Sequence, residues 1–275
     1  MVDTRTRVFA VIGNPIEHSL SPLIHNTAFS ELKVNNVYVA FKVTNVKSAI
    51  DSMKELNFGG YSVTIPHKVE VMKYLDEIDS LAKKIGAVNT VVNNDGKLIG
   101  YNTDVFGAIN ALKEKINLEG KKVYVLGAGG AARAIVAGLV EEKAIVTIFN
   151  IVPADAEKLA NEFNCKWKEW NTVDSNCGIL VNATSVGMSP NVDSMPIDAK
   201  LLKKEMLVFD VVYNPLETKL IKEAKKIGCT VVPGLEMFLG QAYAQVKLFT
   251  GKEAPRELMK KVLLTELEKL QSMHK

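Results

Sequence analysis

The residues that most constrain the fold of this chain are 122–134, which read K-V-Y-V-L-G-A-G-G-A-A-R-A. A short apolar strand runs into glycines and then into a helix, and Gly127, Gly129 and Ala132 have the spacing of the G-x-G-x-x-G/A turn. In that turn the first glycine makes the bend, the second lets the backbone approach a pyrophosphate, and the third small residue permits close packing of helix on strand. Amide groups at the helix N-terminus would hold the phosphates. The pattern therefore predicts a dinucleotide-binding βαβ unit.

The segments around the glycines support this interpretation. Val123–Leu126 has the composition of a buried strand, Gly130–Val140 that of the following helix, and Ala144–Phe149 that of a second buried strand. Glycine-rich turns that bind no ligand are common, so the turn alone would be weak evidence. The strand, helix and strand together favour a bound nucleotide over a merely structural bend.

The chain is expected to form two domains. Its 275 residues suffice for two hydrophobic cores, and the glycine turn begins only at Gly127, which leaves an independent domain's length before it. We place the dinucleotide-binding domain at residues 105–237. Residues 1–104 together with 238–275 are expected to form the substrate-binding domain, with the C-terminal helices packed back on it.

Apolar runs and turn residues predict alternating strands and helices in the N-terminal part. Ser21-Pro22 is typical of a helix N-cap followed by proline, and Asn94-Asp95-Gly96 of a hairpin turn. We expect strands at 8–12, 37–43, 61–65, 89–93 and 97–101, and helices at 21–33, 46–56, from Pro66 onward, and from Thr103 or Asp104 to about Lys115. This alternation indicates a parallel sheet with crossover helices and an antiparallel edge at the hairpin.

The C-terminal part continues this pattern and then changes. Strands at 178–182, 207–212 and 230–232, with a helix at 218–227, complete a doubly wound sheet. Two helices follow at 235–249 and 255–270 with no strand between them. The predicted fold class is therefore α/β, with an N-terminal α/β domain and a Rossmann-type doubly wound dinucleotide-binding domain.

Composition excludes several classes of function. The net charge of +3 comes from interspersed acidic and basic residues, so no basic stripe is available for a nucleic-acid backbone. No apolar run reaches the roughly 18 residues of a membrane span, and Met1–Arg7 leads into a strand without a signal-peptide core. We expect a cytoplasmic protein, a monomer or a homodimer, that acts on a small molecule.

The cysteines and histidines predict no metal site. The cysteines are few and widely spaced, so we expect reduced, structural thiols: Cys165, Cys177 and Cys229. The histidines form no paired metal-binding motif: His18, His25, His67 and His274.

Ligands in open α/β sheets bind at the carboxyl ends of the strands, so residues there are candidates for the site. Ser19 and Ser21 would combine two hydroxyls with a helix N-terminus, which favours a small carboxylate, although capping alone explains Ser21. Lys68 follows T-I-P-H near a predicted helix start, where the helix dipole opposes a cation. A residue that breaks a local rule invites a functional explanation, although a solvated surface lysine is the commoner outcome.

Three further polar residues are ambiguous from their positions alone. Asp104 in G-Y-N-T-D-V-F-G either caps a helix or serves a site. Gln241 and Gln245 are one helical turn apart in an apolar segment, where they face either a cleft or solvent.

Taken together, eight motifs resemble those of the shikimate dehydrogenase family, in the same order and over most of the chain. They are V-I-G-N-P-I-E-H-S-L-S-P-L-I-H-N, G-G-Y-S-V-T-I-P-H-K, G-A-V-N-T-V, G-Y-N-T-D-V-F-G, G-A-G-G-A-A-R-A, N-A-T-S-V-G-M, D-V-V-Y-N-P and G-L-E-M-F-L-G-Q-A. The resemblance implies reversible, NADPH-dependent reduction of 3-dehydroshikimate to shikimate, a step of aromatic amino-acid biosynthesis. Such a reaction needs a group that donates a proton in reduction and accepts one in oxidation.

The resemblance also implies roles for individual residues. Lys68 and Asp104 match the catalytic pair of the family, with Lys68 suited to donating a proton to the ketone oxygen and Asp104 to orienting it. Ser19 and Ser21, with Tyr213 nearby, match the residues that bind the substrate carboxylate. Thr64, Asn89 and Gln241 match the residues that bind the ring hydroxyls of the substrate. Cofactor contacts are matched to Gly127, Ala128, Gly129, Gly130, Ala131, Asn150, Thr184, Val211 and Gly234.

The chain departs from the family pattern after the second strand of the nucleotide unit. NADP-specific members typically carry N-R-T-x-x-R there, and their arginines grip the 2′-phosphate. Here the run is N-I-V-P-A-D, so Ile151 and Asp155 replace both arginines, and Asp155 would repel a phosphate if it points inward. The acidic residue typical of NAD sites is also absent, since Asn150 stands at the strand end. We expect NADP as cofactor on family grounds, with NAD as the alternative.

Two other functions remain open at this point. One is an NAD-dependent quinate/shikimate dehydrogenase of the same fold, although Ser21 favours shikimate because some quinate-preferring relatives have threonine there. The other is a catalytically silent nucleotide-binding regulatory protein, although such a protein has little use for a proton-transfer pair.

Overall fold

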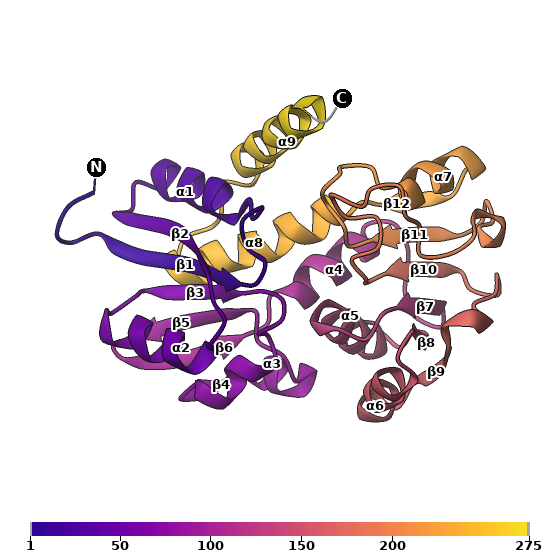
Figure 1. The fold of residues 1–275 in the computed structure, drawn as a ribbon, viewed down its shortest axis with the longest axis horizontal. Coiled ribbons are helices and arrows are strands. Elements are labelled where there is room, and N and C mark those ends of the chain that lie inside the picture. Colours follow the sequence, from indigo (N-terminus) through magenta and orange to yellow (C-terminus); the bar gives the residue numbers. More distant parts are fainter. Residues whose placement is uncertain (1, 274–275) are drawn as a thin grey trace. The chain divides into compact units, whose positions relative to one another are not determined.

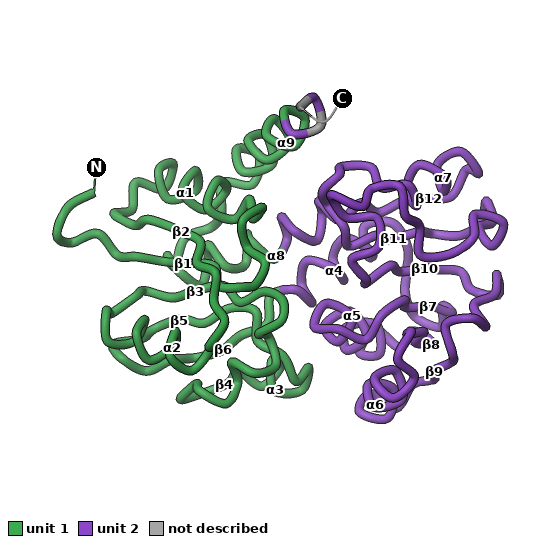
Figure 2. Tube along the Cα trace, viewed as in Figure 1, with its two compact units in different colours: residues 1–103, 241–269 green, residues 104–240, 270–275 purple. Residues whose placement is uncertain are grey.

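The computed structural model describes residues 2–273, and His274 lies outside them. The chain divides into two compact units, each with its own sheet (Figures 1 and 2). Unit 1 comprises residues 1–103 and 241–269, and unit 2 comprises 104–240 and 270–275. Our expected division differs at three places, since Asp104, residues 238–240 and the end of the last helix are grouped with unit 2.

Unit 1 is built on a six-stranded sheet of order β2-β1-β3-β5-β6-β4. Its strands are β1 (Arg7–Gly13), β2 (Asn36–Lys42), β3 (Gly60–Val63), β4 (Glu77–Ile78), β5 (Thr90–Asn94) and β6 (Lys97–Tyr101). Its N-terminal helices are α1 (Ser21–Glu31), α2 (Val46–Glu55) and α3 (Ser80–Ile85), with a 3₁₀ turn η1 (Glu70–Tyr74). Strands β2, β1 and β3 are parallel, and β5 runs antiparallel to β3 and β6.

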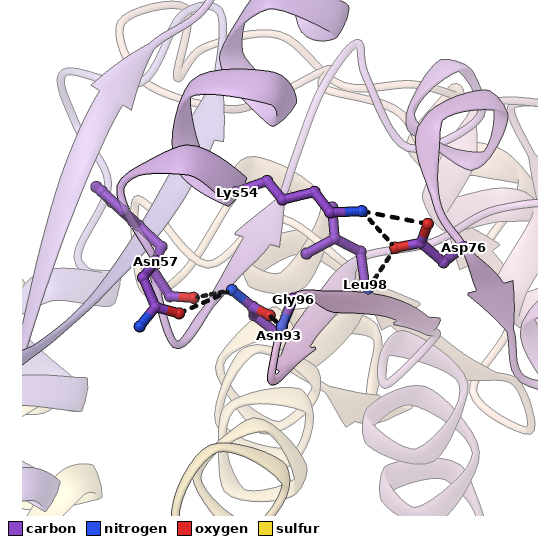
Figure 3. A network of polar contacts seen from close by, with 7 residues as sticks. Lys54, Asn57, Asp76, Asn93, Gly96 and Leu98 are labelled. Carbon is purple, nitrogen blue, oxygen red and sulfur yellow. Dashed lines mark hydrogen bonds and ion pairs between the residues drawn. The ribbon is translucent and has the colours of Figure 1, made fainter.

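The β5–β6 hairpin forms where the sequence predicts it. Asp95 and Gly96 have φ values of 50° and 88°, the left-handed pair that a two-residue hairpin turn requires. The Asn93 side chain fixes this end of the hairpin, because its Oδ1 accepts from the Gly96 amide at 2.7 Å and its Nδ2 donates to the Phe58 carbonyl at 2.9 Å. Figure 3 shows this cluster beside the Lys54–Asp76 ion pair.

The helix expected from Pro66 does not form. The chain turns instead and enters the short 3₁₀ segment η1 only at Glu70. Other segments hold this backbone: the Lys68 carbonyl accepts from the Val88 amide at 2.8 Å, and the His67 ring bonds the Val43 carbonyl at 2.8 Å. A carbonyl engaged in this way is unavailable to a regular helix. Lys68 is therefore not opposed by a helix dipole, and that argument for its role was wrong.

Unit 2 has an all-parallel sheet of order β12-β11-β10-β7-β8-β9, the doubly wound topology that the glycine turn predicts. Its strands are β7 (Lys122–Leu126), β8 (Ile145–Asn150), β9 (Lys166–Glu169), β10 (Ile179–Asn182), β11 (Leu207–Asp210) and β12 (Thr230–Val232). Its helices are α4 (Asp104–Lys113), α5 (Gly130–Glu141), α6 (Pro153–Phe163) and α7 (Lys219–Ile227), with 3₁₀ turns η2 (Trp170–Thr172) and η3 (Ala199–Leu201). Strand order reverses between β7 and β10, which is where such sheets bind ligands.

Helices α8 (Gly234–Thr250) and α9 (Arg256–Met273) close the chain. From Gln241 to residue 269 they belong to unit 1, and Phe249 of α8 packs against Phe9 of β1 with ring centroids 4.9 Å apart. The expected return of the C-terminal helices to the first domain is confirmed over this range. The predicted α/β fold class is confirmed as well.

Candidate active site

The glycine turn of unit 2 has the geometry of a nucleotide-binding loop. Gly127 has a φ of 107°, which only glycine adopts readily, and its amide donates to the Phe149 carbonyl of β8 at 2.7 Å. A Cβ at Gly127 would also lie 3.1 Å from the Thr184 methyl group. The first glycine is therefore required by the fold itself.

Gly129 differs, because nothing in the protein requires it to be glycine. Its φ is −76°, which any residue adopts, and a Cβ there would meet no protein atom within 4 Å. It is the N-cap of α5, whose first turn presents unpaired amides. Backbone left bare at a helix N-terminus suits the close approach of an anionic phosphate group. Ala132, the third small residue, is fully buried, as expected for helix–strand packing.

A buried polar cluster lies behind the ends of β10 and β11. Asp210 accepts from Thr218 Oγ1 at 2.7 Å, from Asn182 Nδ2 at 2.9 Å and from the Val212 amide at 3.1 Å. Asn182 Oδ1 in turn accepts from Thr184 Oγ1 at 2.6 Å. We call Asn182, Thr184, Asp210 and Thr218 the Asp210 cluster. It ties the candidate cofactor residue Thr184 to the strand end that precedes Val211.

Burial makes Asp210 an unusual carboxylate. The side chain is fully buried, and burial raises its pKa to about 6, although the three hydrogen bonds oppose this by favouring the ionised form. Gly234 lies close by, since a Cβ on it would be 2.4 Å from the Val211 carbonyl oxygen. Val211 and Gly234, both matched to cofactor contacts, are therefore neighbours.

The strand end at β8 carries no cation. Asn150 donates from Nδ2 to the Val152 carbonyl at 3.0 Å, and Ile151 and Val152 are exposed apolar side chains. Helix α6 begins at Pro153 without a side-chain cap, and Asp155 is the acidic residue of its first turn. A negative charge at this helix N-terminus already complements the helix dipole and disfavours a second anion.

The two serines of unit 1 lie at the start of α1, and neither is its N-cap. Helix α1 begins at Ser21 itself, with Pro22 next, and Leu20 in the N-cap position makes no side-chain bond. Ser19 precedes the N-cap, and its Oγ accepts from the Ser21 amide, the first amide of α1, at 3.3 Å. Ser21 is buried and does not cap, contrary to our expectation.

Backbone hydrogen bonds bring three candidate residues to one edge of the unit 1 sheet. The Val63 amide donates to the Asn89 carbonyl at 2.7 Å, which places Thr64 and Asn89 at neighbouring strand ends. The Val88 amide donates to the Lys68 carbonyl at 2.8 Å. Thr64, Lys68 and Asn89 therefore lie on adjoining stretches of backbone.

The side chain of Asn89 is held rigidly. It is buried, its Oδ1 accepts from the Thr103 amide and from Thr90 Oγ1, both at 2.8 Å, and its Nδ2 donates to Thr103 Oγ1 at 2.9 Å. Asn102 Nδ2 donates to the Ala87 carbonyl at 2.9 Å and anchors the same loop. The chain then passes directly from Thr103 to Asp104, the first residue of α4.

The glutamines of α8 do not face solvent. Gln241 is nearly buried and Gln245 is 1 % exposed. Gln245 bonds His25, Ser62 and Thr90, three residues from distant parts of the chain. Sequence reasoning missed these partners, and the one local signal was the presence of a second glutamine in an apolar helix.

Asp104 and Tyr213 belong to unit 2. Asp104 is buried at the start of α4. Tyr213 stacks on Phe238 with ring centroids 4.2 Å apart, and burial raises the pKa of its phenol to about 12. The phenol is therefore a neutral hydrogen-bond donor at neutral pH.

Models of one family match most of the chain. Residues 11–91 match the family model "Shikimate dehydrogenase substrate binding domain", residues 110–223 match "Shikimate / quinate 5-dehydrogenase", and residues 234–264 match "Shikimate 5'-dehydrogenase C-terminal domain". The chain belongs to the shikimate dehydrogenase family. The resemblance inferred from the eight motifs is thus confirmed, and the family consists of oxidoreductases.

Individual members of the shikimate dehydrogenase family are similar over their full length. The "Shikimate dehydrogenase (NADP(+))" of Methanocaldococcus jannaschii is 44% identical over 98% of this chain and 100% of its own. A crystal structure of a shikimate dehydrogenase in complex with NADP⁺ has a TM-score of 0.93 at 44% identity, covering 97% of this chain and 98% of that one. The Listeria monocytogenes enzyme, solved with shikimate and NAD, has a TM-score of 0.85 at 36% identity, covering 95% and 98%.

Two features that other protein classes use are absent from the described part of this shikimate dehydrogenase family member. Within residues 2–273, no cluster of three or more histidine, cysteine or acidic side chains is arranged to hold a metal ion. Over the same range, none of the helices combines the length and apolar composition that crossing a bilayer requires. Cys165, Cys177 and Cys229 are free thiols, as expected.

Proposed function

We propose that this chain is a shikimate dehydrogenase that reversibly reduces 3-dehydroshikimate to shikimate with NADPH, in the biosynthesis of aromatic amino acids. The observation that carries the proposal is the arrangement in unit 1, where backbone hydrogen bonds place Thr64, Lys68 and Asn89 on adjoining stretches at one sheet edge. These residues have the chemistry that a polyhydroxylated acid needs. They occur in a chain whose relatives, matched over 94% and 98% of its length, are named as NADP-dependent shikimate dehydrogenases.

The proposed substrate contacts follow from the chemistry of each group. The hydroxyls of Ser19 and Ser21 lie at the N-terminus of α1, where a carboxylate gains from hydroxyl donors and from the helix dipole. Tyr213 is proposed as a further donor to the carboxylate. Thr64, Asn89 and Gln241 are proposed to bind the ring hydroxyls, and the rigid hold on Asn89 fixes the direction in which it can bond.

The proposed chemistry divides between proton and hydride transfer. Bound NADPH supplies the hydride that reduces the carbonyl carbon. Lys68 donates the proton to the carbonyl oxygen as it becomes a hydroxyl and accepts it in the reverse direction. Asp104 is proposed to orient Lys68 and the substrate hydroxyl. The two residues form the proposed catalytic pair.

The proposed cofactor contacts lie in unit 2. Gly127 to Ala131 form the bend and the first turn of α5, where the bare backbone at Gly129 suits a pyrophosphate. Thr184, Val211 and Gly234 line the ends of neighbouring strands. Asn150 stands at the end of β8, where the adenosine ribose binds in this topology.

Steady-state kinetics of the purified protein tests the proposal directly. Shikimate and quinate are each assayed with NADP and with NAD, and formation of the reduced cofactor is followed by its absorbance. The highest kcat/KM is expected for shikimate with NADP. No reduction of either cofactor would overturn the proposal and support a silent nucleotide-binding protein.

A specific observation keeps a second function in view, an NAD-dependent quinate/shikimate dehydrogenase. No arginine or lysine occupies residues 150–155, and Asp155 is acidic. A higher kcat/KM with NAD than with NADP, together with turnover of quinate, would establish it. We also propose that the enzyme is cytoplasmic and that it is a monomer or a homodimer. Size-exclusion chromatography with light scattering would test its oligomeric state.

A further inference from the structure

Gln245 is the centre of a buried hydrogen-bond network in unit 1. Its Oε1 accepts from Ser62 Oγ at 3.0 Å and bonds His25 Nε2 at 3.1 Å, and its Nε2 donates to Thr90 Oγ1 at 2.9 Å. Tyr38 joins through its hydroxyl, which donates to Ser62 at 2.5 Å. We call these five residues the Gln245 network.

The hydrogen bonds that Gln245 makes have fixed directions. Gln245 Oε1 carries no proton, so His25 donates from Nε2. Burial lowers the pKa of His25 to about 3, which makes it neutral at physiological pH and leaves that proton on Nε2. Thr90 accepts from Gln245 and donates to Asn89 Oδ1 at 2.8 Å. The network is therefore polarised toward Asn89.

Gln245 and each of its three partners lie close in sequence to a proposed substrate-binding residue. His25 is one helical turn after Ser21 on α1, and Gln245 is one turn after Gln241 on α8, so each pair shares a helix face. Ser62 lies in β3 two residues before Thr64, which directly follows the strand and continues its pairing with β1 by donating to the Ile12 carbonyl at 2.9 Å. In an extended strand this spacing puts the two side chains on the same face. Thr90 is adjacent to Asn89 and bonded to it.

The members of the network are too deeply buried to contact a substrate themselves. His25 and Thr90 are 0 % exposed, and Tyr38 and Gln245 are 1 % exposed. The His25 ring also stacks on Tyr38, with centroids 4.2 Å apart and planes 6° from parallel. His25 Nδ1 is buried without a hydrogen-bond partner, so it is the bonds made by Gln245, Ser62 and Thr90 that restrain the elements contributing to the network.

We propose that Gln245 is a positioning residue, which holds α1, β3, β5 and α8 in the register that lets Ser21, Thr64, Asn89 and Gln241 bind the same substrate. This inference rests on the proposed function, because it assigns a purpose to the residues that surround that site. Its substrate class is the same hydroxylated carboxylic acid. Loss of the Gln245 side chain would let these four residues move independently. It would therefore weaken the binding of substrate more than it would slow proton transfer.

The test compares Gln245→Met with Asn93→Leu. Each change replaces a buried amide in unit 1 by an apolar side chain of similar shape. Asn93 serves as the matched control because it bonds Gly96 and Phe58 at the turn end of β5, within the cluster that Figure 3 shows. Both variants are expected to lower the melting temperature. Only Gln245→Met is expected to raise KM for shikimate, about tenfold, with kcat within a factor of three and KM for NADP unchanged.

A double-mutant cycle with Thr90→Val separates positioning from general loosening. Thr90→Val removes the link between Gln245 and Asn89 but preserves shape, so it should raise KM for shikimate severalfold by itself. Because both changes break the same chain of hydrogen bonds, the double variant should have nearly the KM of Gln245→Met alone. If Gln245→Met does not fold, the test depends on Thr90→Val alone, which should raise KM for shikimate more than Asn93→Leu does.

The outcomes distinguish this inference from the proposed function. If Gln245→Met and Thr90→Val change KM no more than Asn93→Leu does, or if their effects multiply, the positioning role is overturned while the function stands. If the wild-type protein reduces neither cofactor with shikimate, the proposed function itself fails.

Discussion

The two units present their candidate ligand groups in different ways. Unit 2 offers mostly backbone and small residues, at Gly127, Gly129 and Gly234, where what matters is the absence of a side chain. Unit 1 offers side chains from separate segments, which must be brought to one edge and held there. A site made of backbone is therefore encoded locally, whereas a site made of side chains needs a tertiary framework.

The frameworks behind the two edges also differ in charge. The Gln245 network consists of neutral groups, since burial keeps His25 uncharged. The Asp210 cluster has a buried carboxylate at its centre, whose pKa burial raises to about 6. The first framework is therefore insensitive to pH near neutrality, whereas the second changes its charge just below neutrality.

The largest effect is expected from Lys68→Ala in unit 1. Proton transfer by a positioned group typically contributes about 10²- to 10⁴-fold, so kcat should fall within that range while KM for shikimate changes little. Lys54→Ala is the control, because Lys54 is an exposed lysine of the same unit that pairs with Asp76. Near-normal turnover of Lys68→Ala in steady-state assays would remove the lysine from the chemistry.

The next effect concerns stability and comes from Asp210→Asn in unit 2. The pKa of Asp210 is raised in the folded state from 3.8 to about 6, so the folded protein binds more protons than the unfolded chain between these values. Its contribution to stability is therefore present below about pH 4 and is lost as the pH rises to about 6, by about 3 kcal/mol. The stability of wild type relative to Asp210→Asn should fall by this amount over that window, as measured by urea unfolding.

Asp174→Asn in the same unit provides the control of opposite sign. The Asn176 amide and the Tyr124 hydroxyl lower the pKa of Asp174 by bonding its ionised form. Its contribution is present above its unfolded pKa and is lost as the pH falls through the folded value. If both aspartates gave differences of the same sign, the buried carboxylate at Asp210 would not be the cause.

Ser19→Ala should have an intermediate effect, confined to substrate binding. One lost hydrogen bond to a carboxylate corresponds to about 1–2 kcal/mol, or roughly a tenfold rise in KM for shikimate. Ser19 also bonds the first amide of α1, so Asn45→Ala is the matched control, since Asn45 caps α2 by accepting from Ser48 at 2.9 Å. A similar rise in KM for both variants would show that Ser19 only stabilises the start of its helix and does not bind the substrate.

The contrast between the units explains how much the sequence could predict. The turn at Gly127 and the hairpin at Asp95-Gly96 were predictable because each depends on one or two adjacent residues with positive φ. The partners of Gln245 were not, because His25 and Ser62 are 220 and 183 residues away and reach it only in the folded unit.

Segments whose structure depends on hydrogen bonds to distant parts of the chain could not be predicted from the local sequence either. The stretch after Pro66 is fixed by bonds to Val43 and Val88, so its own helical pattern did not decide its structure. Strand β4 has two residues and β9 has a polar sequence, K-W-K-E, so neither gives an apolar strand signal. The site residues proposed from family motifs await the kinetic tests above.

The smallest effect is expected from Ile151→Arg at the end of β8. Ile151 is 73 % exposed, so an arginine there would meet a 2′-phosphate in solvent, where a charge pair contributes about 1 kcal/mol or less. The ratio of kcat/KM for NADP to that for NAD should therefore rise only a few-fold, and the gain should shrink at high salt. Ile151→Gln keeps a long polar side chain without the charge and should leave the ratio unchanged. An equal change with both cofactors would show that residue 151 does not face the ribose, and the search for what selects the cofactor would move to Asp155.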